Sequence, residues 1–397
     1  MNRRESGASF RPEAVYKGPN APFLPGQSAL AKPPSPVKPA PRAGHPFPRK
    51  PERPADAVKE TVRPEIRSHE PRGPARPSAA AALKRPMPAV LGPRLATEEV
   101  GSLLITEGWD DYRLLDMGEG EKLERYGELT VIRPEPQAMG PRRLAPSVWA
   151  AAGAAFTGDV EEDGPGRWRT EPGIGSAWEM RVMDLPVVCR LTSFRHVGIF
   201  AEQIAHWAWM AERLRAHRGP ERPKLLNLFG YTGIASLIAA EAGAEVTHVD
   251  ASKKSVAWGR ENQALAGLDA APIRWIVDDA VKFAEREVRR GKRYDGILLD
   301  PPRFGRGPDG EVWSLETDLP HLLDLTRQIL APGPAFAVLT AYAIRASFLS
   351  IHEITADLLG HRPGVLSSGE LAVRETGDPT RPGRLLATSM FSRFLGV

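Results

Sequence analysis

Buried-strand and helix patterns alternate along residues 224–340 of this 397-residue chain. Short apolar runs separated by helical spacing predict five strands: 224–229, 245–250, 273–277, 294–300 and 335–340. Parallel strands need crossover connections, which helices on both faces of a sheet supply. We therefore predict a doubly wound α/β sheet. Two later runs, 369–374 and 385–394, predict an antiparallel hairpin that closes one edge of this sheet.

The chain upstream of the predicted sheet has a different character. Apolar stretches broken by turn residues over 104–133 and 176–200 predict strands and hairpins, while 149–168 is rich in Gly, Ala and acidic residues and predicts a loop. From 205 to 217, apolar residues recur at the spacing of an α-helix, which predicts a helix over this segment. We expect an N-terminal arm over 1–95, a small β-rich domain on the substrate side over 96–200, and the α/β domain over 201–397.

The first 95 residues carry 18 Lys and Arg against 7 Asp and Glu, and 20 of the 39 prolines. Proline fixes φ and removes a backbone donor, so this density predicts a disordered basic arm. The rest of the chain holds 35 basic against 42 acidic residues and is net acidic. An alternative is that translation begins at Met87 and that the arm is partly a misread frame.

Composition excludes several classes of protein. A single cysteine rules out an intramolecular disulfide framework and a Cys-cluster zinc site. No apolar run approaches the roughly 20 residues that cross a bilayer, and the N-terminus lacks the apolar stretch of a secretory signal. His206, His248 and His321 show no metal-ligand spacing and are interpreted as structural. We expect a cytoplasmic protein that binds neither metal nor membrane.

Ligands of open α/β sheets bind beyond the carboxyl ends of the strands, so we expect a site there. The first strand ends in Asn227-Leu-Phe229-Gly230-Tyr-Thr-Gly233, where glycines allow a close backbone approach to a ligand beside a helix N-terminus. A tight turn that needs glycine for packing is an equal alternative. The turn lacks a glycine of the dinucleotide fingerprint, which disfavours an NAD(P) oxidoreductase.

Acidic residues end the next two strands. Asp250 can accept hydrogen bonds from ribose hydroxyls, and Ser252 is the better candidate to cap the helix that follows. After the third strand, Asp278 and Asp279 could hold an adenine amino group, or could equally cap a helix.

The fourth strand ends in Asp300-Pro301-Pro302-Arg303-Phe304, the most specific of these motifs. The prolines restrict the backbone and so fix Asp300 at the end of the strand. Phe304 offers a ring on which a nucleic-acid base can stack. We predict that Asp300, Pro301, Pro302 and Phe304 form the catalytic segment.

The motifs in this order resemble the class I S-adenosylmethionine-dependent methyltransferases, specifically the bacterial 23S rRNA large-subunit methyltransferase group. The resemblance covers residues 105–397 and includes 112–118, 123–127, 132–134 and His196-Val-Gly-Ile-Phe200-Ala-Glu-Gln203. It implies S-adenosyl-L-methionine as cofactor and RNA, namely 23S rRNA, as partner. The implied cofactor-binding residues are Phe200, Gln203, Asn227, Phe229, Gly230, Gly233, Asp250, Ser252, Asp278, Asp279 and Asp300.

The residues favour one kind of acceptor atom and allow more than one class of substrate. Methylation of a pyrimidine carbon needs a thiolate, and the one cysteine, Cys189, lies in a predicted strand, so we expect a ring nitrogen or exocyclic amine as acceptor. Trp149, Trp168 and Trp178 are either base-stacking platforms or core residues. Two alternatives remain, namely a methyltransferase of small molecules or proteins, and a non-catalytic RNA-binding adapter.

Overall fold

The computed structural model describes residues 87–89, 91–158, 166–342 and 346–397. The predicted disordered arm therefore lies outside the described residues as far as residue 86. In the described part of the chain, no helix has the length and apolar character needed to cross a membrane.

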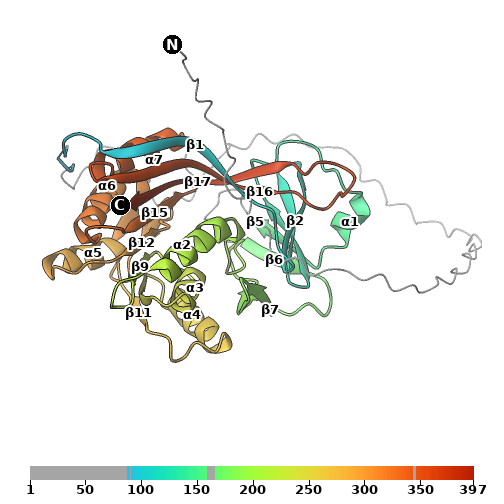
Figure 1. The fold of residues 1–397 in the computed structure, drawn as a ribbon. Coiled ribbons are helices and arrows are strands. Elements are labelled where there is room, and N and C mark those ends of the chain that lie inside the picture. The colour runs from blue at the N-terminus through green and yellow to red at the C-terminus, as the bar shows by residue number, and fades with distance from the viewer. Residues whose placement is uncertain (1–86, 90, 159–165, 343–345) are drawn as a thin grey trace, which may run out of the picture. The chain divides into compact units, whose positions relative to one another are not determined.

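An eight-stranded sheet forms the centre of the fold, in the order β1-β16-β17-β15-β12-β9-β10-β11 (Figure 1). Its strands are β1 (Ala96–Thr106), β9 (Lys224–Leu228), β10 (Glu245–Asp250), β11 (Ile273–Val277), β12 (Gly296–Leu299), β15 (Phe336–Ala341), β16 (Gly364–Arg374) and β17 (Leu385–Gly396). Strands β9 to β12 and β15 are parallel, whereas β17 is antiparallel to both of its neighbours. The predicted strands and the C-terminal hairpin are confirmed.

Helices cover both faces of this sheet. One face carries α2 (Ile204–Ala216), α3 (Ile234–Glu241) and α4 (Lys253–Leu265), and the other carries α5 (Ala280–Arg289), α6 (Leu315–Ile329) and α7 (Phe348–Leu359) (Figure 1). Successive side chains of a strand point to opposite faces. Leu225 accordingly packs in the core with α2 and α3, and its neighbour Leu226 in the core with α5 and α6. The doubly wound α/β fold is confirmed.

A smaller β region precedes α2. A five-stranded sheet comprises β2 (Tyr112–Gly118), β3 (Glu121–Tyr126), β4 (Leu129–Pro134), β5 (Ala154–Gly158) and β6 (Gly166–Thr170), with α1 (Pro146–Ala150) before β5. A separate hairpin is formed by β7 (Ala177–Val182) and β8 (Leu185–Arg190). The prediction of a loop over 149–168 is wrong in part, because the described residues of this segment include β5 and the start of β6.

The predicted boundary of the small domain at residue 96 also differs from the structure. Residues Ala96–Thr106 form β1, which pairs in parallel with β16 of the large sheet. An unpaired outer strand presents free backbone donors and acceptors, and β1 satisfies those of β16. This pairing joins segments more than 250 residues apart, so no local pattern could reveal it.

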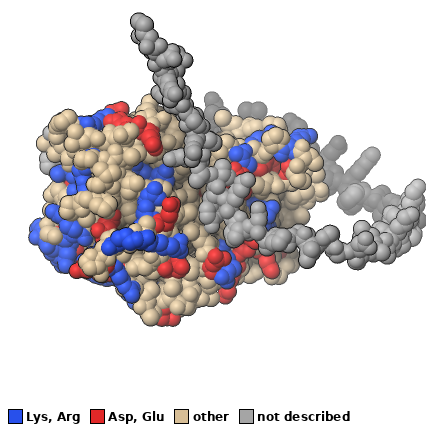
Figure 2. Space-filling view, viewed as in Figure 1, with Lys and Arg blue, Asp and Glu red and all other residues tan. Residues whose placement is uncertain are grey.

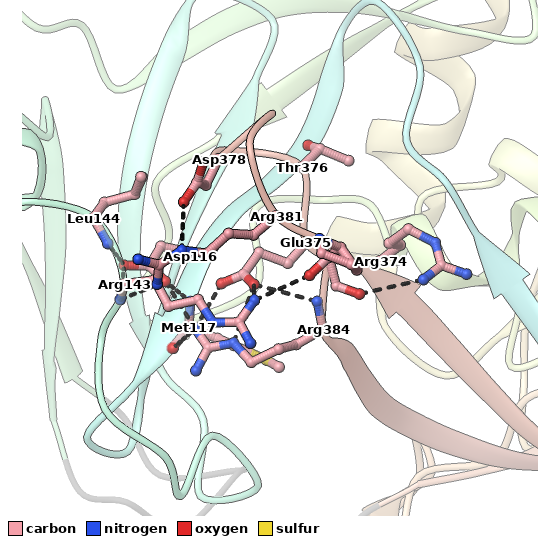
Figure 3. Close-up of polar contacts among 12 residues, drawn as sticks. Asp116, Met117, Arg143, Leu144, Arg374, Glu375, Thr376, Asp378, Arg381 and Arg384 are labelled. Atoms are coloured by element: carbon pink, nitrogen blue, oxygen red, sulfur yellow. Dashed lines mark hydrogen bonds and ion pairs between the residues drawn. The ribbon is translucent and has the colours of Figure 1, made fainter.

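A buried polar cluster, which we call the Asp116 cluster, connects the small sheet to the β16–β17 hairpin (Figure 3). The Asp116 carboxylate is fully buried and accepts bonds from the Leu144 amide (2.9 Å), Trp149 Nε1 (2.8 Å) and Arg384 Nη2 (2.9 Å). Arg384 also bonds Glu375 at 2.6 Å. Strand β2, the segment around α1 and the β16–β17 hairpin are therefore joined by one network of hydrogen bonds and ion pairs.

We predict that Asp116→Ala lowers the free energy of unfolding by about 2–4 kcal/mol, because it leaves the Leu144 amide and the buried Trp149 Nε1 without their acceptor and removes one of the two carboxylates that pair with Arg384. Chemical denaturation measures this loss. Asp269→Ala, at an exposed carboxylate, is the matched control and should change stability by less than about 0.5 kcal/mol. Equal stability of the two variants would contradict a structural role for the cluster.

Candidate active site at the carboxyl edge of the sheet

A cleft opens at the carboxyl ends of β9, β12 and β15. The chain runs from β9 outward to β11 and then crosses to β12 on the other side of β9, and such a reversal creates a crevice between the two strands. The cleft holds about 540 Å³ of empty volume, which includes space open to solvent. Six predicted residues line it: Phe200, Gln203, Asn227, Phe229, Gly230 and Asp300.

The turn after β9 has an unusual backbone. The backbone lies in the left-handed region at Phe229 (φ 58°), Tyr231 (φ 51°) and Gly233 (φ 80°). Residues other than glycine rarely adopt this conformation. The turn is held by the neighbouring strand: the Gly230 amide donates to the Val249 carbonyl (3.1 Å) and the Tyr231 amide to Asp250 Oδ2 (2.8 Å). Strain of this kind persists only where the surroundings enforce it and is frequent at ligand sites.

Buried side chains support this turn from below. The Asn227 amide donates to Ser236 Oγ (2.9 Å), which lies 3.0 Å from His248 Nδ1. Burial lowers the pKa of His248 to about 3, so the imidazole is neutral. A Cβ on Gly230 would overlap the His248 ring, so this glycine is needed for packing, as the alternative interpretation of the motif holds.

Asp300 lies at the tip of β12 beside Gln203. Its Oδ1 atom is buried and has no hydrogen-bond partner in the described part of the chain. Burial, and next the nearby Glu202 carboxyl, raises the pKa of Asp300 to about 7, while a hydrogen bond from Gln203 opposes this. Thr340 Oγ1 donates to Gln203 Oε1 (3.4 Å), which turns the amide nitrogen of Gln203 away from Thr340. An unpaired carboxyl oxygen in a cleft is a ready acceptor for a ligand donor.

The segment after Asp300 is rigid. Trp313 Nε1 donates to the Pro302 carbonyl (2.7 Å), and Trp313 belongs to the short hairpin of β13 (Phe304–Arg306) and β14 (Val312–Ser314). Phe304 is 51% exposed, and the Arg303 guanidinium lies over its ring at 5.1 Å. Pro301, Pro302 and Phe304 do not line the cleft itself but follow directly on the residue that does.

Aromatic rings border the cleft. Phe200 contacts His196 at 4.7 Å between ring centroids, Tyr231 at 5.6 Å and Tyr342 at 5.9 Å. These separations are those of aromatic rings in direct contact, so the rings support one another along the cleft.

The remaining predicted residues lie at neighbouring strand tips, outside the cleft lining. Gly233 is the N-cap of α3, and Asp250 bonds the Tyr231 amide and, through Oδ1, the Ser252 amide (2.8 Å). Ser252 caps α4, as predicted. Asp279 caps α5, and Asp278 pairs with Arg286. The acids after β11 therefore already have protein partners, and their adenine role stays a prediction.

Among the cleft residues that sequence reasoning did not assign to a site are His206, Tyr231 and Thr340. Thr340 lies near the carboxyl end of β15 and could have been found by the rule applied to the other strands. Tyr231 lies inside the glycine motif, and His206 is three residues beyond Gln203 on the same helical segment.

The tryptophans and the other singled-out histidine have structural partners. Trp149 is buried against Asp116, and Trp178 Nε1 donates to the Tyr126 carbonyl (2.8 Å). Trp168 packs edge-on against Phe156 at 5.3 Å, and His321 pairs with Glu285 at 3.2 Å. Across the described ranges, no three His, Cys, Asp or Glu residues are grouped so that they could hold a metal ion.

Comparison with known proteins gives one consistent result. Residues 162–358 match the family of S-adenosylmethionine-dependent methyltransferases. The crystal structure of the SAM-dependent methyltransferase from Agrobacterium tumefaciens is 50% identical, with a TM-score of 0.75, over 78% of this chain and 98% of that one. The chain is also similar to enzymes named ribosomal RNA large subunit methyltransferase K/L. The Shewanella sp. (strain MR-4) enzyme is 28% identical over 57% of this chain and 34% of its own length. The Desulfotalea psychrophila enzyme is 37% identical over 30% of this chain and 17% of its own length. The chain thus spans about a third or less of these curated relatives.

We predict that the stability of the protein, measured without cofactor, depends on pH through Asp300. An aspartate in an unfolded chain titrates near pH 3.9, and the folded pKa is about 7, so the folded state binds more protons between about pH 4 and 7. Stability should therefore fall as the pH rises through this window. Asp300→Asn cannot titrate and should gain on the order of 2–4 kcal/mol relative to the wild type between pH 5 and 8.

Denaturant unfolding of both proteins at pH 5, 6, 7 and 8 measures this difference. Parallel stability profiles for the wild type and Asp300→Asn would show that Asp300 titrates normally.

Proposed function

Because the chain belongs to the family of S-adenosylmethionine-dependent methyltransferases, we propose that it methylates a base of large-subunit ribosomal RNA. The observation that supports this most is the cleft at the β9–β12 crossover, with its strained turn and the unpaired Asp300 oxygen. The names of the relatives with the same domain support the choice of acceptor. A ribosomal RNA substrate implies a cytoplasmic protein.

The residues of the cleft fit the cofactor. S-adenosylmethionine supplies a methyl group bonded to a positively charged sulfur. Asp300 Oδ1 is available to accept a hydrogen bond from the ammonium group of such a ligand. Asp250 uses one acceptor site on each oxygen for backbone amides, and each oxygen keeps a second for a ribose hydroxyl. Phe229 and Gly230 border the space between these two acids.

The chain contributes to the reaction mainly by holding its reactants. Methyl transfer by displacement needs donor and acceptor in line, and orientation in a dry cleft provides much of the acceleration. The Trp313–Pro302 bond fixes the segment from Asp300 to Phe304, so the Asp300 carboxyl and the exposed Phe304 ring keep a constant separation. We propose that Phe304 stacks on the target base, next to the cofactor whose ammonium group is bonded to Asp300.

The acceptor atom in this proposal is a ring nitrogen or an exocyclic amine. Cys189 is fully buried in the core shared by the small β region and α2. Burial raises the pKa of its thiol to about 12, so the thiolate required to activate a pyrimidine carbon does not form at neutral pH. The buried position therefore argues against carbon methylation through this cysteine.

Positive charge for RNA binding is concentrated in residues 1–95. On the face shown in Figure 2, Lys and Arg are interspersed with Asp and Glu, and basic side chains gather toward its left edge. Because phosphate attraction grows with the number of Lys and Arg contacts, we propose that the basic arm adds sequence-independent affinity for RNA.

We predict that Asp250→Ala weakens binding of S-adenosylhomocysteine by about 1–3 kcal/mol, because hydrogen bonds to the ribose hydroxyls are lost. Isothermal titration calorimetry measures the affinity. Asp250→Asn, which keeps one carbonyl oxygen, should lose less, and the exposed Asp269→Ala should bind like the wild type. Unchanged affinity of Asp250→Ala would exclude the ribose role.

We also predict that deletion of the gene removes one base methylation from large-subunit rRNA, which mass mapping of rRNA fragments detects. Plasmid-borne wild type and Cys189→Ala should both restore the mark, whereas Asp250→Ala should restore less. A complete set of large-subunit marks in the deletion strain would refute the proposed substrate. Failure of Cys189→Ala alone, if it folds normally, would instead point to carbon methylation.

A further inference from the structure

The lining of the cleft includes a buried histidine whose polar atoms are unpaired among the described residues. His206 lies in the first turn of α2, is 2% exposed and lines the cleft. Neither of its ring nitrogens has a hydrogen-bond partner in the described ranges. Buried polar groups in folded proteins are almost always paired, so both atoms call for an explanation.

The surroundings of His206 define its chemical state. Its ring packs edge-on against Phe391 of β17, with 5.1 Å between ring centroids. Burial, and next the charge of Arg393, lowers the pKa of His206 well below its ordinary value. The imidazole is therefore neutral, with one N–H to donate.

Two groups of opposite hydrogen-bonding character lie beside Gln203 in this cleft. Gln203 donates a hydrogen bond to Asp300, whose pKa is raised by burial and next by the nearby Glu202 carboxyl. His206 follows Gln203 by three residues at the start of α2, so the two side chains lie on the same face of the helix. Within the described part of the chain, Asp300 Oδ1 is an unpaired acceptor and the His206 ring, near the charge of Arg393, is an unpaired donor, and both residues line the cleft. A ligand that carries an ammonium and a carboxylate on the same carbon is complementary to this pair.

We propose that His206 donates its ring N–H to the carboxylate of the amino-acid portion of S-adenosylmethionine, while Asp300 Oδ1 accepts from the ammonium. This inference rests on the cofactor of the proposed function and not on the RNA acceptor. It assigns a binding role to a residue that the sequence suggested was structural. It also accounts for the unpaired polar atoms of Asp300 and His206, which line the same cleft.

If His206 had only a structural role, its replacement would change the cofactor affinities in a different way. Replacing it with leucine removes two unpaired polar atoms from the core, which by itself is neutral or stabilising for the cofactor-free protein. A structural residue would therefore leave cofactor affinity unchanged or would weaken every cofactor analogue equally. A carboxylate ligand predicts a loss restricted to analogues that carry the carboxylate.

The experiment removes the histidine donor from the protein and, separately, the carboxylate from the ligand. Calorimetry compares S-adenosylmethionine with decarboxylated S-adenosylmethionine, which keeps the sulfonium and the amine but lacks the carboxylate. His206→Leu should weaken S-adenosylmethionine binding roughly 10- to 100-fold and leave the decarboxylated ligand within about twofold of the wild type. His206→Gln, which keeps an N–H donor, should recover part of the lost affinity.

His352→Leu is the matched control. His352 is equally buried, in α7, but both of its nitrogens are paired, with Ser368 Oγ at 3.0 Å and Glu98 Oε2 at 2.9 Å. This variant should lose stability and bind both ligands normally. Thermal unfolding of all variants shows which of them are folded at the temperature of the titration.

Two results would overturn the assignment: unchanged S-adenosylmethionine affinity in folded His206→Leu, or an equal loss for both ligands. Failure of the proposed function is seen separately. A wild type that binds neither ligand refutes the cofactor, and a wild type that binds them but restores no rRNA mark refutes only the RNA acceptor.

Discussion

The turn after β9 is the constraint on which the rest of the site depends. Three of its residues lie in the left-handed region, and the turn keeps this shape because β10 holds it through the Val249 carbonyl and the Asp250 carboxylate. The His248 ring fills the space beneath Gly230, and the Trp275 ring fills the space beside Gly233. The helix α3 starts at Gly233, so the same turn sets the position of a helix N-terminus.

The proposed division of roles follows from the order of the strands. Because β9 lies between β10 and β12, its turn has the Asp250 tip on one side and the Asp300 tip on the other. In our proposal one acid accepts from the ribose and the other from the ammonium, and the turn spans the distance between them. Strand β15 adds Thr340, which orients Gln203 and through it the hydrogen bond to Asp300.

The small β region is tied to this sheet at two places. The Asp116 cluster connects it to the β16–β17 hairpin (Figure 3). A continuous apolar core also joins it to α2 and α3. The segment from His196 to Gln203 connects the small region to the wall of the cleft. Phe200 lies on this segment and contacts His196, so contacts that hold the small region in place also hold Phe200. Cys189 lies in the shared core, which is why it is inert despite its proximity in sequence to the cleft residues.

The sequence by itself determined the α/β sheet, its C-terminal hairpin and six residues of the cleft, because hydrophobic period and turn residues are local signals and parallel strands align their carboxyl ends. It also placed Ser252 as a helix cap from its position alone. Only the tertiary structure decided the pairing of β1 with β16, which depends on a sheet edge formed by residues far away. The roles of Gly230 as a packing residue and of Asp279 as a cap, and the unpaired nitrogens of His206, were likewise decided there. A buried polar atom finds its hydrogen-bond partners on distant segments of the chain. The spacing of residues in the sequence therefore cannot show whether such an atom is paired.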